Sequence, residues 1–163
     1  MRVNYEDWQA TCDTLHAHSQ VLGKLAAKLA PPEPQLQHAA LRLTARGIET
    51  LPLPAPSGAG AFAVALDLHA HEAVVEDDAG SVRRVPLTPD RAVAEVTHDV
   101  LSAVRDLVGA VEISMAPQEV AWTTPLDEDI EHATYDTEQV SAYFAAASRA
   151  ALALAKASGN GYA

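Results

Sequence analysis

The sequence has little cysteine, little aromatic content and few basic residues. One of its 163 residues is a cysteine, Cys12, which excludes an intrachain disulfide framework and a multi-cysteine zinc site. Aromatic residues make up 5% of the chain, so the core has to be built from alanine, valine and leucine. The 11 Lys and Arg against 22 Asp and Glu give a formal net charge of −11. That charge argues against binding to nucleic-acid phosphates or to an anionic membrane surface.

Long hydrophobic runs are absent as well. The first residues contain no apolar signal region, and no run is long enough to cross a bilayer, so we expect a soluble cytoplasmic protein. The chain still has material for one core, because 48% of its residues are hydrophobic and a domain of this length buries about 70% of its unfolded surface. We expect a single domain over residues 1–157, followed by a flexible C-terminal tail over residues 158–163.

Helical spacing of apolar residues begins near the N-terminus. It predicts a helix from about Asn4 to Ala30, which ends where two prolines cannot continue it. We expect this helix to pack one apolar stripe on a sheet. The stripe consists of Trp8, Cys12, Leu15, Leu22, Ala26 and Leu29.

Two further helices are predicted later in the chain. One is expected to begin at Thr88-Pro89, where a cap precedes a proline, and to end at Gly109. The other is expected to follow Asp136, an N-cap residue that Gln139 would complete as a capping-box-like pair.

Alternating apolar and polar residues between and after the first two helices predict strands. Asp77-Asp78-Ala79-Gly80 is typical of a hairpin turn, so the central strands should form an antiparallel meander. The order of elements predicts an α+β fold, in which an antiparallel or mixed sheet of about six strands carries three main helices largely on one face. The expected strands lie at residues 39–44, 48–51, 62–68, 74–75, 82–85 and 111–115.

The first helix also carries a polar stripe, formed by Asp13, His16, Gln20 and Lys24. A stripe of this kind is commonly a solvated face. The alternative is that His16 and Lys24 bind or act on an anionic group, because histidine transfers protons near neutral pH.

Asp67-x-His69-x-His71 is the best local cluster of metal-binding residue types. At strand spacing the three side chains share a face, where they could hold a transition metal. The ordinary interpretation is an exposed hairpin tip, and no second histidine pair at helical ligand spacing supports a metal. We therefore expect no metal site and no cofactor, with Asp67, His69 and His71 as the alternative metal ligands.

Catalytic motifs are not recognisable. The chain has no nucleophile elbow, phosphate-binding glycine loop or dinucleotide fingerprint, so we favour a protein that is not an enzyme. Cys12 lies on the apolar stripe, which favours a buried small hydrophobe. Asp127-Glu128-Asp129 is interpreted as a solvated acidic loop, because it lacks the glycine and terminal glutamate of a calcium loop.

Several blocks together resemble the uncharacterised bacterial domain-of-unknown-function family 5996. They are Trp8-x-x-Thr11-x-x-Thr14-Leu15-His16, Gln20, Gly23-Lys24, Pro31-Pro32, Leu43-Thr44-x-Arg46-Gly47, Asp67 with His71, Pro86 to Pro89, and Glu131-His132-Ala133-x-Tyr135-Asp136. The family carries two tryptophans before the residue that is His38 here, where this chain has Gln35-Leu36-Gln37. It also continues into an aromatic-rich segment, so the chain resembles its N-terminal part or a short variant. The resemblance implies no mechanism.

Two functions remain open from the sequence. The first is a non-catalytic binding or interaction module. The second is a small enzyme or small-molecule-binding protein with a His- and Lys-lined pocket between the first helix and the sheet. Convergence of at least two candidate groups in one pocket would favour the second. The candidate ligand-binding residues are His16, Gln20, Lys24, His38, Asp67 and His71.

Expected partners are a protein, a small anionic ligand, or a second copy of the chain. The homodimer is suggested by the strand around Phe62 to Leu68, whose other face presents Ala61, Ala63 and Ala65. A sheet face of alanines invites close approach by another element, and the alanine-rich last helix is the only spare element. We expect a two-fold homodimer.

Overall fold

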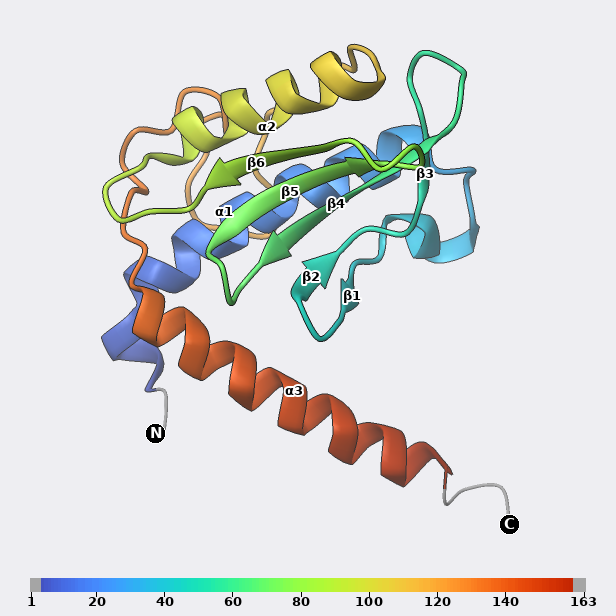
Figure 1. Ribbon diagram of the computed structural model, residues 1–163. Coiled ribbons are helices and arrows are strands. Elements are labelled where there is room, and N and C mark those ends of the chain that lie inside the picture. The colour runs from blue at the N-terminus through green and yellow to red at the C-terminus, as the bar shows by residue number, and fades with distance from the viewer. Residues whose placement is uncertain (1–3, 160–163) are drawn as a thin grey trace.

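The computed structural model describes residues 4–159 (Figure 1). It has the expected α+β architecture, in which a six-stranded antiparallel sheet packs against helices. In Figure 1, α1 passes behind the strands, α2 lies above them on the side of β6, and α3 extends from one end of α1 away from the strands. The elements are α1 (Tyr5–Leu29), η1 (Pro34–Ala39), β1 (Arg42–Leu43), β2 (Gly47–Glu49), β3 (Leu53–Pro54), β4 (Ala61–Asp67), β5 (Glu72–Asp77), β6 (Val82–Pro86), α2 (Val93–Val108) and α3 (Thr137–Gly159).

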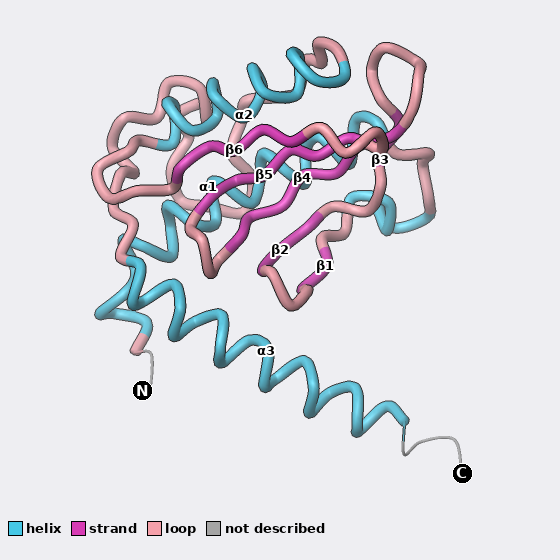
Figure 2. The backbone as a smooth tube through the Cα atoms, viewed as in Figure 1, coloured by secondary structure: helices cyan, strands magenta, loops and turns pink. Residues whose placement is uncertain are grey.

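The sheet confirms the predicted central meander. Its strands follow the order β1-β2-β4-β5-β6, with β3 paired to the start of β4 (Figure 2). The hairpin between β5 and β6 forms at Asp77, whose carboxylate accepts hydrogen bonds from the backbone N–H groups of Ala79 and Ser81. On β4, Phe62, Val64 and Leu66 enter the core, as their alternation predicts.

One predicted strand is wrong and one short strand was not predicted. Residues 111–115 alternate between half-buried and exposed, but they pair with no strand. Their apolar side chains, Val111, Ile113 and Met115, are half-buried against the core. Instead β3 forms inside the predicted proline-rich loop, where Pro54 lies at an edge that does not need its missing N–H.

Helix α1 confirms the predicted helix, but its buried face is rotated relative to the predicted stripe. Leu15, Leu22 and Ala26 are buried as expected, whereas Cys12 is only half-buried. Trp8 stacks on Tyr143 of α3 at 5.0 Å between ring centroids, and not on the sheet. The buried face includes polar residues that the stripe omitted, and consists of Thr11, Thr14, Leu15, Ala17, His18, Val21, Leu22, Leu25 and Ala26.

Helix α2 begins later than predicted. Its first residue is Val93, and the Thr88-Pro89 pair lies in the preceding turn. The start is set by another part of the chain, because Val93 N–H donates to the His132 carbonyl and Ala94 N–H donates to the Asp129 carbonyl. These bonds satisfy helix N-terminal donors that a local cap would otherwise have to satisfy. The predicted end at Gly109 is confirmed.

Helix α3 confirms the predicted cap. The Asp136 carboxylate accepts hydrogen bonds from the N–H groups of Glu138 and Gln139. The Gln139 side chain does not complete the pair and instead donates to the Asp7 carbonyl. The helix continues to Gly159, two residues beyond the predicted domain end at 157, and the rest of the predicted tail lies outside the described residues. Its buried residues, Val140 and Phe144, both lie in its first third. No helix among residues 4–159 is long and apolar enough to span a membrane.

Candidate functional site

Three of the predicted site residues lie around one hollow. His16, Gln20 and Lys24 line a cavity of about 250 Å³ on the side of α1 that faces η1 and the loop around Gln118. All three side chains are half-buried. The opposite wall of the hollow is this loop, so the site does not lie between α1 and the sheet.

Two of these residues hold the facing loop to α1. The Gln20 amide donates to the Gln118 carbonyl at 2.8 Å and accepts from the Gln118 N–H at 2.9 Å. The Lys24 ammonium donates to the Ala116 carbonyl at 2.7 Å. Burial lowers the pKa of Lys24. The predicted polar stripe therefore fastens residues 116–118, leaving His16 as the histidine of the hollow.

Two residues on the rim of the hollow have a left-handed backbone conformation, which residues with a side chain rarely adopt. Leu36 and Glu119, both lining residues, have φ of 57°, in the left-handed region. Leu36 is also 68% exposed, although it is a large apolar residue. Such conformations cost about 1–3 kcal/mol each and cluster at binding sites. The rim therefore combines backbone strain with an exposed apolar side chain.

Gln20→Ala should loosen the loop while leaving α1 folded. Two hydrogen bonds are lost, at about 0.5–1.5 kcal/mol each, so we expect a loss of about 1–3 kcal/mol in the free energy of unfolding. The Gln118 amide should exchange with solvent faster than in the wild type, as measured by hydrogen exchange. Gln9→Ala, an exposed glutamine on the same helix, is the matched control. Unchanged exchange at Gln118 would contradict the fastening role.

His38 is buried, and its role is structural. Its Nδ1 accepts a hydrogen bond from the Glu33 N–H at 3.1 Å, which ties the two ends of the turn that contains η1. His38 does not line the α1 hollow. It therefore does not join His16, Gln20 and Lys24.

Asp67, His69 and His71 lie at the turn between β4 and β5. The Asp67 carboxylate accepts hydrogen bonds from the N–H groups of His69 and Ala70, which closes the turn. The His69 Nε2 lies 3.0 Å from the Ala45 carbonyl oxygen. Across residues 4–159, no group of three His, Cys, Asp or Glu side chains is placed to hold a metal ion.

His71 forms a contact that sequence spacing did not predict. Its Nδ1 lies 3.0 Å from the hydroxyl of Tyr135, which is 2% exposed and 64 residues away in the chain. Burial raises the pKa of Tyr135. Burial also lowers the pKa of His71, and Asp67 partly opposes this lowering. Both shifts favour the neutral forms near pH 7, and the tautomer of His71 decides which of the two groups donates.

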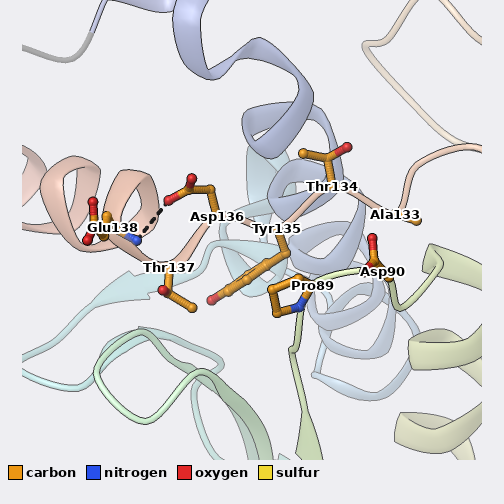
Figure 3. A pocket seen from close by; sticks show the side chains of 8 residues that line it. All are labelled: Pro89, Asp90, Ala133, Thr134, Tyr135, Asp136, Thr137 and Glu138. Carbon is orange, nitrogen blue, oxygen red and sulfur yellow. Dashed lines mark hydrogen bonds between the residues drawn. The ribbon is translucent and has the colours of Figure 1, made fainter.

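Another hollow lies beside Tyr135. It measures about 450 Å³, and Figure 3 shows the Tyr135 ring next to Pro89, between the start of α3 and the turn before α2. Asp90, Asp136 and Glu138 also line it, and the Asp136 carboxylate is already bonded to the Glu138 N–H. The hollow is acidic, which does not suit an anionic ligand.

Two buried polar residues were missed by the sequence reasoning. His18 is 2% exposed, and its Nδ1 has no hydrogen-bond partner in the described structure. Burial and the nearby Arg91 lower its pKa to about 4, and Asp129 opposes part of the shift. The signal for His18 was its helical spacing with Thr14 and Leu22, which places it on the buried face.

Asp129 is the second missed residue, and it corrects the interpretation of residues 127–129 as a solvated loop. It is fully buried and accepts hydrogen bonds from the N–H groups of Glu131 and His132. Its other oxygen lies 2.7 Å from the His132 Nδ1. The His132 ring in turn contacts the Trp122 ring in a tilted arrangement, with 4.2 Å between ring centroids.

The blocks that carry the family resemblance meet at this end of the molecule. Thr11 of the first block accepts a hydrogen bond from the Asp136 N–H of the last block, and Tyr135 contacts His71. No curated protein and no solved structure matches the chain. The model of a family of unknown function, DUF5996, matches residues 1–160, which is nearly the whole chain, as the blocks of resemblance implied. The chain therefore belongs to the DUF5996 family of unknown function.

Proposed function

We propose that the protein is a non-catalytic binding module that uses the C-terminal half of α3 to bind a protein partner. The observation that carries the proposal is the exposure of residues 149–159, every one of which is exposed. Leu152 and Leu154 are 67% and 69% exposed. A helix with apolar residues on all sides is normally buried against another element.

The polar candidates support binding over catalysis. Gln20, Lys24 and His38 have their polar groups bonded to backbone, and His71 is bonded to Tyr135. Side chains held in this way stabilise loops and turns and are less available for proton transfer to a substrate. The partner surface should be apolar and acidic, because residues 139–159 contain Arg149 and Lys156 and no Asp or Glu.

In-cell photo-crosslinking tests the proposal. A photoreactive residue at Ala151, on exposed α3, should yield one recurrent protein adduct in the cytoplasm, and the same residue at exposed Ala121 should not. The adduct should disappear in the Leu152→Glu/Leu154→Glu variant, because two carboxylates make the helix unsuited to an apolar surface. The absence of any adduct dependent on these leucines would refute the proposal.

A small anionic ligand in the α1 hollow is the second candidate function. It is favoured by the convergence of His16 and Lys24 on one hollow, the feature that we set as the mark of a ligand site. Glu119 on the rim opposes an anion, and the Lys24 ammonium is already bonded.

A thermal-shift screen with a library of metabolites, with and without divalent metals, tests this second function. An anion that binds should raise the melting temperature of the wild type and not of Lys24→Gln. Lys28→Gln, at an exposed lysine one turn along α1, is the matched control. If no compound distinguishes Lys24→Gln from Lys28→Gln, this hollow is not an anion site.

A further inference from the structure

The end of α3 is an apolar helix without cover. Residues 149–159 are five alanines and two leucines with Arg149, Lys156, Ser158 and Gly159, and all of them are exposed. In Figure 1 this part of α3 runs away from the sheet and the other helices. Short helical segments are only marginally stable in water unless they pack against another surface. We therefore expect residues 149–159 to pack against a partner surface.

The face of the sheet opposite the core carries apolar residues that suit the exposed part of α3. Ala63 pairs with Glu76 and Ala65 pairs with Val74, so all four lie on the face opposite the core residues Phe62 and Val64. Helices α1 and α2 lie on the core side. Ala65 and Val74 are only 3% and 2% exposed, so the accessible part of this face is its end at half-buried Ala63 and exposed Glu76.

A hollow of about 210 Å³ lies at the end of this face where β4 begins. Its floor is apolar, and three carboxylate residues form one side. The lining residues are Pro52, Ala61, Phe62, Ala63, Glu76, Asp77 and Asp78. An apolar floor beside carboxylates suits a helix that presents leucines next to a basic residue.

The same molecule's α3 does not reach this hollow. The packed part of α3 contacts the other end of β4, where Phe144 meets His69 in the β4–β5 turn at 5.1 Å between ring centroids. The hollow lies at the opposite end of β4, and every residue in the C-terminal half of α3 from 149 to 159 is exposed. The occupant must therefore come from another molecule.

We propose that the partner of α3 is a second copy of this chain, with Leu152, which shares a helix face with Lys156, seated in the hollow between Ala61 and Glu76. Lys156 then lies next to the carboxylates. A two-fold axis lets each copy give its helix and receive the other, which closes the assembly. This inference rests on the proposed function and names its partner.

The basic residues of α3 favour docking on the sheet over the packing of two α3 helices against each other. Two α3 helices packed together would bring Arg149 and Lys156 of both copies near one another, with no carboxylate on either segment. Docking on the sheet brings the same two residues to an acidic surface. Like charges in contact weaken an interface, whereas complementary ones favour it.

Sedimentation equilibrium of the purified full chain over the micromolar range tests the dimer. The wild type should approach twice the monomer mass as concentration rises. Leu152→Glu/Leu154→Glu and Ala63→Glu should each raise the dissociation constant at least ~10-fold, which is about 1.4 kcal/mol. An equimolar mixture of these two variants should recover part of the dimer, because one intact helix then meets one intact hollow. Ala121→Glu, exposed elsewhere, is the control.

Glu76→Lys provides a second test of the hollow at an exposed position, in case Ala63→Glu fails to fold by circular dichroism. A monomeric wild type over this range would overturn the inference. So would a dimer that the helix variants or both hollow variants leave unchanged. If the wild type is monomeric but Ala151 still crosslinks to another protein, the proposed function stands and only the self-association fails. If Ala151 yields no adduct either, both fail.

Discussion

Asp129→Ala should lower the free energy of unfolding by ~3–5 kcal/mol, the largest effect of any single substitution proposed here. The Asp129 side chain is fully buried and bonds to two backbone N–H groups and to the His132 ring. Removing the carboxylate leaves these donors without a partner, at about 1–3 kcal/mol for each that stays buried. Chemical denaturation at neutral pH measures the loss.

The lower free energy of unfolding of Asp129→Ala should be accompanied by faster hydrogen exchange at the start of α2. Val93 and Ala94 donate to carbonyls of the segment that Asp129 holds in place, so their amides should exchange faster in Asp129→Ala. Glu128→Ala, at an exposed neighbour, should stay within about 0.5 kcal/mol of the wild type. A loss below about 1 kcal/mol in Asp129→Ala would show that the carboxylate does not hold this segment.

Acidification should destabilise the protein through His18, by about 3 kcal/mol between pH 6.5 and pH 4. Burial first, and Arg91 second, lower the pKa of His18 from 6.5 to about 4 in the folded state. Between these values the unfolded chain binds a proton that the folded chain does not, so stability falls as the pH falls. The part of the free energy of unfolding that depends on His18 being unprotonated is fully present above pH 6.5. The lowered pKa of His71 acts in the same direction.

His18→Leu should flatten this pH dependence, because no imidazole is then buried. The variant also removes the Nδ1 atom that lacks a partner, so its stability at pH 7 should stay close to that of the wild type. His98→Leu replaces an exposed histidine on α2 and should keep the steep acid dependence. Denaturation curves at pH 7, 5.5 and 4.5 compare the three proteins. Equal slopes in wild type and His18→Leu would contradict the assignment to His18.

Local chemistry determined the elements of this protein. The period of apolar residues set α1 and the β4–β5–β6 meander, and Asp136 and Gly109 fixed helix ends, because caps and turns depend on a few neighbouring residues. The α+β class followed from the order of these elements. The family resemblance was also carried by residues in sequence.

Tertiary structure decided how α1 is used. Its buried face includes His18, which the periodicity of apolar residues alone could not assign to the core. Its polar stripe holds residues 116–118 in place, because Gln20 and Lys24 donate hydrogen bonds to carbonyl groups more than 90 residues away. Helical spacing shows which residues share a face, and the partner of that face depends on packing.

Long-range contacts also decided the buried polar groups and the course of α3. Asp129 looks in sequence like one carboxylate of an acidic loop. Its carboxylate bonds to neighbouring residues, but it is buried where its segment meets the start of α2, whose Ala94 N–H donates to the Asp129 carbonyl. Tyr135 meets His71 through a long-range contact as well. The alanine-rich helix was expected to cover only part of the alanine face of its own sheet, and its exposed half extends away from the strands, because the start of α3 is fixed by Phe144 and by Trp8 on Tyr143. The direction of α3 is set by these few packed side chains, and residues 149–159 beyond them are all exposed.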